Sequence, residues 1–466
     1  MDKYNSNDTI AALSSAFGKS AIAVIRVSGP ESFEVLSKIF KTSHNTSLKP
    51  VAIRHKEIQY GFIIDGSEKI DEVICLFFKA PHSYTGEDLV EINIHGNPLI
   101  IKTVLELLFK KGIRQAEGGE FTYLAFLNGK KDLSEAEGVC DLINSKTSSA
   151  ARASLNNLSG GFSERINEIR ESIIEFLTFL EASLDYPNED DVPFLSPAEK
   201  SQKIENLKDK TTKLISLYKI SKILKDGLKA AIIGKPNAGK SSLLNAIVGR
   251  DRAIVTEIEG TTTDTIEESI DCSGIPLTII DTAGIRNKTQ DKIEVLGMEK
   301  TKEVIKQSDI VLWILDLSRA ADENDLEIAA LLKENSAEIP IFAVLNKSDL
   351  KRDFDFDFKG LKIDGFFEVC ALNGKGIAAL LNEIAKRAGI MESQNDFLMI
   401  NARHSGLLNG ILAALERAQK ALLDKDADDI GCYELKQALS FSDEILGINT
   451  PHDILDSIFS TFCIGK

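Results

Sequence analysis

The sequence predicts a multidomain chain, in which an α+β domain precedes a helical domain interrupted by an inserted α/β P-loop domain. With 466 residues, the chain is too long for one hydrophobic core. An apolar run, a glycine-rich loop and an apolar helix follow one another at residues 229–249, with amphipathic helical stripes on both sides. Short apolar strands mixed with helices in the first third indicate a separate α+β domain.

The composition is that of an ordinary globular protein, with 43% hydrophobic and 27% charged residues. No run of about twenty apolar residues is present, and the N-terminus lacks a signal-peptide layout. We therefore expect a cytoplasmic protein without a membrane anchor. The six cysteines show no CxxC pair, which argues against a disulfide framework or a zinc site. The net charge of −16 repels phosphate backbones, so any work on a nucleic acid would require a more basic partner.

The segment "GKPNAGKSS" (residues 234–242) matches the phosphate-loop pattern GxxxxGK[ST] between a strand and a helix. Its glycines let backbone N–H groups point at phosphates, and the helix N-terminus adds partial positive charge. We expect Lys240 to reach the β- and γ-phosphates and the Ser241 hydroxyl to bind Mg²⁺. The pattern predicts a nucleotide site.

Two further motifs indicate guanine. "TIIDTAG" (residues 278–284) ends a strand with Asp281, which suits the magnesium shell. In "IPIFAVLNKSDL", Asp349 can accept both guanine N–H donors, which adenine lacks. Each string alone could be an ordinary loop, but the three in order resemble the G domain of translation-factor-like GTPases, a doubly wound fold. "EVCAL" (residues 368–372) occupies the place of the Ser-Ala-Lys base loop. The predicted GTP-binding residues are Asn237, Ala238, Gly239, Lys240, Ser241, Ser242, Thr256, Glu257, Ile258, Glu259, Gly260, Thr261, Thr262, Asp281, Thr282, Ala283, Gly284, Asn346, Lys347, Ser348, Asp349, Cys370, Ala371 and Leu372.

The residue that orients the attacking water in Ras-like enzymes is absent. A Gln follows their DTAG-type motif, whereas Ile285 follows here. An amide oxygen of Asn237 could instead hold a monovalent cation, which would supply positive charge in place of an arginine finger. Thr262 is the expected second magnesium ligand in the switch segment "TEIEGTTTD". Glu294 is a candidate for orienting the water, although by position alone it would be a solvated helix residue.

Helical stripes flank the P-loop segment. Apolar residues recur at helical spacing before it at Ile166, Ile169, Ile173, Leu177, Leu180 and Leu184, and after it at Leu408, Ile411, Leu415 and Leu422. Such stripes are more often core than binding surface. They indicate a helical domain into which the P-loop domain is inserted.

Longer motifs accompany the GTPase motifs on both sides. They are "NDTIAALSS", "IRVSGP", "SYTGEDLVEINIHG", "GEFTYLAFLNGKKDLSEAEGVCDLI" and the terminal "CIGK". The combination of "FLNGK.DL" with a terminal Cys-x-Gly-Lys is the most specific feature. With these motifs, the chain resembles the MnmE (TrmE) family of tRNA uridine-modification GTPases over residues 7–466.

The resemblance implies a potassium-stimulated GTPase that dimerises through an N-terminal domain binding a one-carbon tetrahydrofolate. With the FAD-dependent partner MnmG (GidA), such proteins add a carboxymethylaminomethyl or aminomethyl group to C5 of the tRNA wobble uridine. The implied domains are 1–120 for folate binding and dimerisation, 121–222 and 389–466 for the helical domain, and 223–388 for the G domain.

The resemblance also implies site residues. Glu294 takes the water-orienting position, and the terminal helix would bring Cys463 back to the folate domain as an acid, base or nucleophile, unless the tail is purely structural. The implied folate ligands are Arg26, Glu91, Lys130 and Lys466, and the implied potassium ligands are Asn237, Thr256, Ile258 and Thr261.

Two alternatives stay open at this stage. An Era/Der-like ribosome-assembly GTPase would share the G-domain motifs but would not explain the N-terminal third or the tail. Such proteins commonly carry a basic RNA-binding domain, which this acidic chain does not show. A folate enzyme with a vestigial GTPase is disfavoured by the intact Lys240, Ser241 and Asp281.

Overall fold

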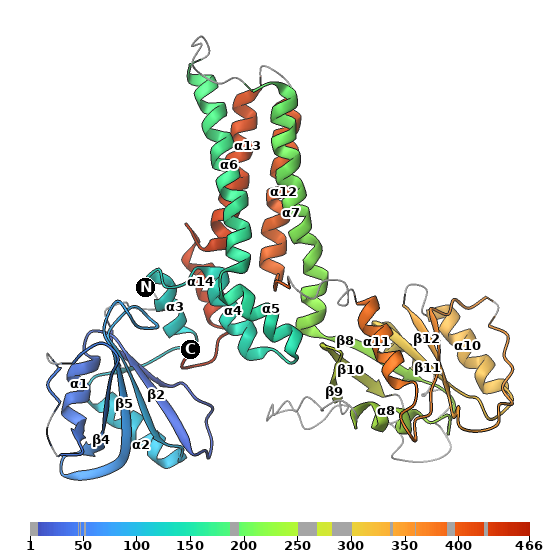
Figure 1. Cartoon of the computed structure of the whole chain (residues 1–466), viewed down its shortest axis with the longest axis horizontal. Helices are drawn as coiled ribbons and strands as arrows, with labels where there is room; N and C mark the ends of the chain where they lie inside the picture. The colour runs from blue at the N-terminus through green and yellow to red at the C-terminus, as the bar shows by residue number, and fades with distance from the viewer. Residues whose placement is uncertain are drawn as a thin grey trace. The chain divides into compact units, whose positions relative to one another are not determined.

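The structure is a computed structural model of the chain (Figure 1), and it divides into two compact units. The first unit comprises Met1–Cys140, Leu158–Leu207 and Gly410–Lys466, and the second comprises Asp141–Asn157 and Lys208–Asn409. The residues that the structure describes are 8–44, 46, 48–50, 53–186, 195–249, 268–281, 301–335, 339–358, 360–388, 397–423 and 427–466.

A mainly antiparallel sheet forms the centre of the N-terminal part of the first unit. Its strand order is β3-β4-β5-β6-β2-β1-β7, and only the short β1–β7 pair is parallel. The strands are β1 (Ile10–Leu13), β2 (Ile22–Ser28), β3 (Phe40–Thr42), β4 (Glu57–Asp65), β5 (Glu68–Phe78), β6 (Leu89–His95) and β7 (Arg114–Gln115).

Helices α1 (Ser32–Ile39) and α2 (Pro98–Lys110) cover one face of this sheet. Alternation along β5 explains why, because Val73 and Cys75 are buried under the helices while Ile74 points to the other face. Helix α2 begins where Asn97 accepts a hydrogen bond from the backbone N–H of Leu99. The opposite face is covered in part by α3 (Glu120–Leu127), whose Phe121 and Leu124 pack with Ile10 and Ala12 of β1. This face also holds the polar group described below.

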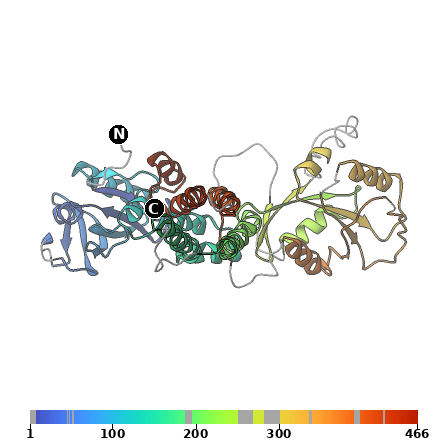
Figure 2. The same cartoon turned by 90° about the horizontal axis from the view of Figure 1, so that it is seen from above.

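Long helices form the rest of the first unit. Helix α6 (Gly161–Asp185) packs along α13 (Asp428–Leu446), and Figure 2 views the long helices end-on. Arg170 donates to Asp443 at 2.6 Å across this contact. The predicted stripe is buried at the α6 residues up to Leu180, but Leu184 in the last turn is 43% exposed because the helix ends there. Two short helices of this unit are α3 (Glu120–Leu127) and α14 (His452–Phe459). Three further helices have residues in both units; these are α4 (Leu133–Asn144), α7 (Pro197–Asp226) and α12 (Ala402–Ala421).

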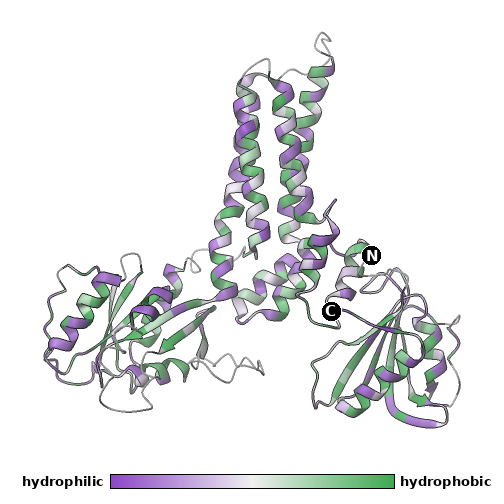
Figure 3. Ribbon diagram, turned by 180° about the vertical axis from the view of Figure 1, so that it is seen from behind, coloured by the Kyte–Doolittle hydropathy of each residue, from purple (hydrophilic) through white to green (hydrophobic). Residues whose placement is uncertain are grey.

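A six-stranded sheet is the centre of the second unit. Its order is β13-β12-β11-β8-β10-β9, and it is parallel except for the β9–β10 hairpin. Its inner strands are mostly green in Figure 3 because most of their residues are apolar. The elements are β8 (Leu228–Ile233), α8 (Lys240–Val248), β9 (Glu268–Cys272), β10 (Ile275–Asp281), β11 (Ile310–Asp316), α10 (Glu323–Asn335), β12 (Ile341–Asn346), β13 (Gly365–Glu368) and α11 (Ile377–Arg387).

The strand order of this sheet predicts where a ligand binds. The chain places β10 on one side of β8 and β11 on the other, so the winding direction reverses at β8. In doubly wound sheets, ligands bind outside the carboxyl ends of the strands at this reversal. The arrangement matches the predicted fold class, an inserted α/β P-loop domain within a helical chain.

Helix α5 (Ser148–Leu158) shares the core of the second unit. Its Ala150 and Ala153 belong to the same buried cluster as the strands β8 to β10. Asn157 Nδ2 donates to the carbonyl oxygen of Met399 at 2.6 Å, and Ser221 Oγ of α7 donates to that of Leu398 at 2.9 Å. Residues 398–399, which follow the inserted domain, are thus hydrogen-bonded to α5 and α7, the two helices that precede that domain in the chain.

Among the described helices, none combines the length and the apolar character that crossing a membrane requires.

Candidate functional site

The phosphate loop, residues 234–239, begins where β8 ends. The backbone N–H of Ala238 donates to the carbonyl oxygen of Lys235 at 3.3 Å. Pro236 and Asn237 occupy the two positions between them, and Asn237 has a φ of 61°. This is the pattern of a type II turn, because proline fixes the first central residue and asparagine tolerates the left-handed second one. The turn leaves the Asn237 side chain exposed.

The loop closes around the amine of Lys240 at the N-terminus of α8. Lys240 Nζ donates to the carbonyl oxygens of Gly234 at 2.7 Å and Lys235 at 2.9 Å. Gly239 precedes the helix with a φ of 100°, and a Cβ at this position would lie 2.1 Å from Nδ2 of Asn346. Glycine is required here both for the backbone conformation and for the close approach. The backbone N–H groups of the first helical turn are then available to a phosphate.

Asn346 connects three of the predicted loops. It ends β12 and is buried. Its amide nitrogen donates to the carbonyl oxygen of Ala238 at 2.9 Å, and its amide oxygen accepts from the backbone N–H of Ala371 at 3.1 Å. Since both bonds are made to backbone groups, one side chain fixes the spacing between the phosphate loop and the base loop.

Lys347 forms an ion pair with Asp316 at the end of β11. Lys347 Nζ lies 2.5 Å from Asp316 Oδ2, and Ser318 donates to Oδ1 through its hydroxyl at 2.6 Å. Burial raises the pKa of Asp316, but the hydrogen bonds from Lys347 and Ser318 outweigh burial and bring it below its usual range. Asp349 and Leu372, both predicted to face the guanine base, are exposed.

A second polar group lies on the face of the N-terminal sheet opposite α1 and α2. Arg26 of β2 and Glu91 of β6 are directly opposite in register, and Arg26 donates to Glu91 Oε1 from Nε at 3.1 Å and Nη2 at 2.7 Å. The guanidinium carbon lies 5.0 Å from the ring centroid of Tyr84 and 5.5 Å from that of Phe121. Arg26 Nη1 is buried without a hydrogen-bond partner in the described part of the chain. An orphaned donor of this kind costs about 1–3 kcal/mol, so a ligand acceptor would be bound favourably here.

The C-terminal tail returns to this domain. The backbone N–H of Gly119 donates to the carbonyl oxygen of Cys463 at 3.4 Å, and Ser14 Oγ donates to that of Gly465 at 3.0 Å. Gly119 lies two residues before Phe121, the ring that faces the guanidinium. The Cys463 thiol is exposed. The tail is therefore held next to the start of α3 with a reactive side chain at the surface.

Two lysines complete the predicted folate set. Lys130 follows α3 and is exposed, and Lys466 at the end of the chain is partly buried. Asn128, two residues before Lys130, donates to the carbonyl oxygen of Thr85 at 2.7 Å, next to the Tyr84 ring. This bond places the loop that carries Lys130 beside the aromatic group around the guanidinium.

Comparison with known proteins assigns the family. The family model of the GTP-binding protein TrmE N-terminus matches residues 9–130, and the model of the MnmE helical domain matches residues 133–463. The tRNA modification GTPase MnmE of Endomicrobium trichonymphae is 54% identical over 99% of this chain and 100% of its own length. The chain belongs to the MnmE family of tRNA modification GTPases. The resemblance predicted from the sequence motifs is thus confirmed.

The chain is also similar to a second curated relative and, more distantly, to a solved structure. The MnmE of Aquifex aeolicus is 40% identical over 98% of this chain and 100% of its own length. A solved GTP-binding protein from Sulfolobus solfataricus in complex with GDP is 19% identical over 48% of this chain and 68% of that chain, with a TM-score of 0.26, too low to compare the two architectures.

Some of the predicted residues of this MnmE-family chain lie outside the described residues. These are residues 256–262, 282–284 and Glu294, and their roles stay predictions. The backbone of Asp281 ends β10 beside Ile232 of β8, which is the edge of the sheet where the phosphate loop begins. The structure brings together the phosphate loop, Asn346 and Ala371, while Ser241 and Ser242 are exposed at the start of α8.

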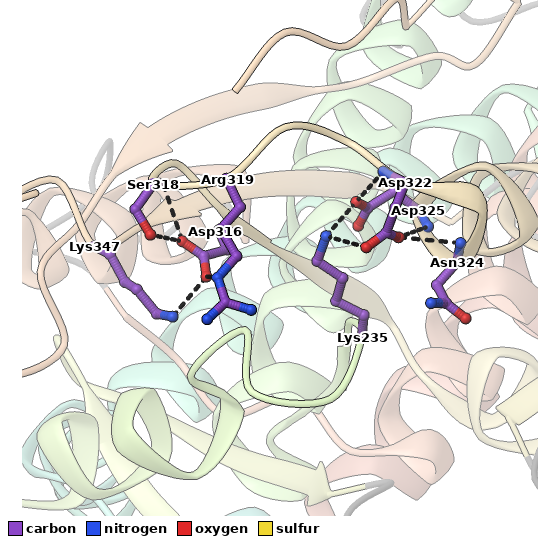
Figure 4. Close-up of polar contacts among 8 residues, drawn as sticks. All are labelled: Lys235, Asp316, Ser318, Arg319, Asp322, Asn324, Asp325 and Lys347. Atoms are coloured by element: carbon purple, nitrogen blue, oxygen red, sulfur yellow. Dashed lines mark hydrogen bonds and ion pairs between the residues drawn. The ribbon is translucent and has the colours of Figure 1, made fainter. Parts of the chain in front are cut away.

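Sequence reasoning missed the acidic connection between β11 and α10. Figure 4 shows Lys235 of the phosphate loop directed toward Asp322 and Asp325, and Lys347 directed toward Asp316. The spacing of two acidic residues at the start of a helix was a readable capping signal. Nothing in the sequence, however, indicated that a phosphate-loop lysine would be their partner.

Proposed function

We propose that this MnmE-family chain is a potassium-dependent GTPase that acts with MnmG, in the cytoplasm, on the wobble uridine of tRNA. The pair adds a carboxymethylaminomethyl or aminomethyl group to C5, with the one-carbon unit supplied by tetrahydrofolate and FAD supplied by MnmG. The observation that carries the proposal is the group formed by Arg26, Glu91, Tyr84 and Phe121, called the Arg26 group below. A ribosome-assembly GTPase of the Era/Der type would not need such a group.

The GTPase half of the proposal follows from the phosphate loop. Lys240 would bind the β- and γ-phosphates, and Mg²⁺ would be held by the hydroxyls of Ser241 and Thr262. Asn237 would bind potassium together with oxygen atoms of Thr256, Ile258 and Thr261, and Glu294 would orient the attacking water. The exposed Asn237 side chain at the tip of a rigid turn supports this role. Binding of GTP would close the switch segments over the nucleotide, and hydrolysis would release them.

The folate half fits the chemistry of the Arg26 group. The partly exposed ring of Tyr84 lies beside the guanidinium and suits a flat pterin ring. The fully buried ring of Phe121 packs against the guanidinium and holds it in place. The unpartnered Arg26 Nη1 is a donor for a ligand acceptor, and Glu91 is an acceptor for ligand N–H groups.

The tail and the lysines would serve the remainder of the ligand. Lys130 and Lys466 suit the glutamate carboxylates of the folate. When bound, the tetrahydrofolate supplies the one-carbon unit. The exposed thiol of Cys463, held by Gly119, would donate or accept a proton or act as a nucleophile there.

An exposed apolar surface supports the proposed homodimer. Ile58, Tyr60 and Ile74 are exposed on β4 and β5, and the register places Tyr60 directly opposite Ile74. Glu91 is opposite Leu76 of β5, so these side chains share the sheet face of the Arg26–Glu91 pair. A second copy covering this face would bury apolar area and enclose the folate group. The chain's net charge of −16 leaves most of the tRNA contacts to MnmG.

Equilibrium binding of 5-formyl-tetrahydrofolate to the full chain tests the proposal. Losing a hydrogen bond to a charged group costs about 1.5–3 kcal/mol, so Arg26→Met should weaken binding about 10- to 150-fold. The exposed Arg54 of the same domain provides the control, Arg54→Met, which should bind as the parent does. Ending the chain at Phe462 should also weaken binding if the tail contributes to the site. If the parent hydrolyses GTP but does not bind the folate, the folate half of the proposal fails while the assignment to the MnmE family stands.

A further inference from the structure

Lys235, the second residue of the phosphate loop, extends to the start of α10. Its Nζ lies 2.7 Å from Asp325 Oδ2 and 2.9 Å from Asp322 Oδ2 (Figure 4). Lys235 is 8% exposed and Asp325 is fully buried. A carboxylate that is buried so deeply needs a cation, because an uncompensated buried charge is strongly destabilising. The contact of Lys235 with Asp322 and Asp325, which we call the tether, is therefore fixed.

The acidic end of the tether is itself rigid. The backbone N–H of Asp322 donates to Asp325 Oδ2 at 3.2 Å, and that of Asp325 donates to Asp322 Oδ1 at 3.3 Å. This reciprocal arrangement is a capping box at the N-terminus of α10, where the helix dipole also favours negative charge. The backbone N–H of Asn324 adds a third bond to Asp322 at 3.1 Å. Backbone hydrogen bonds at the start of α10 thus orient both carboxylates independently of the lysine.

The other end of the tether is connected to the groups that handle the nucleotide. The carbonyl oxygen of Lys235 accepts hydrogen bonds from the backbone N–H of Ala238 and from Nζ of Lys240. Because Pro236 follows, Lys235 is restricted to extended backbone conformations. Fixing its side chain therefore fixes the first residue of the turn whose exposed tip is Asn237.

The charges support a permanent pair. Burial lowers the pKa of Lys235, but the hydrogen bonds to Asp325 and Asp322 outweigh burial and raise it above its usual value. The hydrogen bond from Lys235 in turn lowers the pKa of Asp322. The Lys235 ammonium is thus held charged and directed into the acidic pair.

We propose that Lys235 is a positioning residue of the nucleotide site. Its ion pairs with Asp322 and Asp325 hold the turn that presents Asn237 to a monovalent cation and the carbonyl oxygen that holds the Lys240 amine. Asp316 at the end of β11 holds Lys347, and Asp322 and Asp325 at the start of α10 hold Lys235. The end of β11 and the start of α10 thereby support both the phosphate loop and the loop that follows β12. The part of this inference that concerns the cation rests on the proposed potassium dependence.

The test uses the full chain with Lys235→Met, Lys235→Arg and, as the control, Lys333→Met. Lys333 is an exposed lysine in the last turn of α10, at the other end of that helix from Asp322 and Asp325. GTP hydrolysis is measured against KCl at constant ionic strength, with choline chloride as the balancing salt. The affinity for a fluorescent GDP and the melting temperature are measured in parallel.

Loss of outer-shell support weakens ion binding about 10- to 100-fold. We therefore expect Lys235→Met to raise the half-saturating potassium concentration about tenfold, to retain the rate at saturating potassium, and to weaken GDP binding. Lys235→Arg should restore both, because a guanidinium can donate to the same two carboxylates. Lys333→Met should behave as the parent does.

A lower melting temperature in Lys235→Met with unchanged potassium dependence and GDP affinity would overturn the inference, since the ion pair would then only stabilise the fold. If Lys235→Met does not fold, Asp325→Asn removes the buried charge and should still shift both quantities in the same direction; no shift would overturn the inference. If the parent shows no potassium activation, the proposed cation site fails, and GDP affinity alone then decides whether Lys235 positions the loop.

Discussion

Replacing Asn346 by Ala should separate the phosphate loop from the base loop. The substitution removes both hydrogen bonds of the amide and leaves the carbonyl oxygen of Ala238 and the N–H of Ala371 without partners. Both residues are buried, so water does not replace the lost bonds readily. Each orphaned group costs about 1–3 kcal/mol, which corresponds to about a 5- to 150-fold change in an opening equilibrium.

Hydrogen exchange at the Ala371 amide measures this change directly. In Asn346→Ala the amide should exchange about 5- to 150-fold faster than in the parent, and GDP should bind more weakly. Asn346→Asp is the matched control, because its carboxylate still accepts from Ala371 but cannot donate to Ala238. It should retain slow exchange at Ala371 and still bind GDP less tightly. If the Ala371 amide in Asn346→Ala exchanges as slowly as in the parent, Asn346 does not connect the two loops.

Three further predictions concern single sites. Gly239→Ala should abolish nucleotide binding in a folded protein, because the new Cβ would lie 2.1 Å from the Asn346 amide nitrogen and the backbone φ is 100°. GDP affinity measures the binding and circular dichroism checks the fold. Tight GDP binding would contradict the prediction. The hydrogen bond to Asp71 raises the pKa of His95, so the stabilisation is complete below the unfolded value of about 6.5 and is lost as pH rises through the folded pKa; NMR titration should show a lower His95 pKa in Asp71→Asn. Cys463 is the exposed thiol among the six cysteines, so iodoacetamide should modify it first, and faster labelling elsewhere would argue against the tail position.

The parts of the fold set by local chemistry could be predicted from the sequence. The phosphate loop is one such part, because the local backbone preferences of Pro236, Asn237 and Gly239 favour the turn and the helix start. The stripe of α6 is another, since helical spacing alone decides which side chains face a neighbour. The end of the motif "SYTGEDLVEINIHG" forms β6, in which strand alternation places Glu91 opposite Arg26.

The parts set by long-range contacts could not be predicted. Lys235 meets Asp325 across 90 residues of sequence, and no local pattern chooses a carboxylate at that separation. The aromatic rings of Tyr84 and Phe121 around Arg26 depend on how a loop and a helix pack on the sheet. The quoted motif "SYTGED" contained Tyr84, but alternation within a strand gives no information about a loop residue.

The core of the second unit has a practical consequence for anyone who wishes to study its GTPase in isolation. Ala150 and Ala153 of α5 lie in the same core as β8 to β10, and α5 with α7 clasps the segment after the inserted domain. A fragment cut at the ends of the sheet would lose α5 and place the apolar surface that it covers in water. A fragment intended to remain monodisperse should therefore also include residues 141–157, joined by a linker to residues 208–409. Proteolysis of the native chain should likewise release a piece larger than the nucleotide motifs suggest.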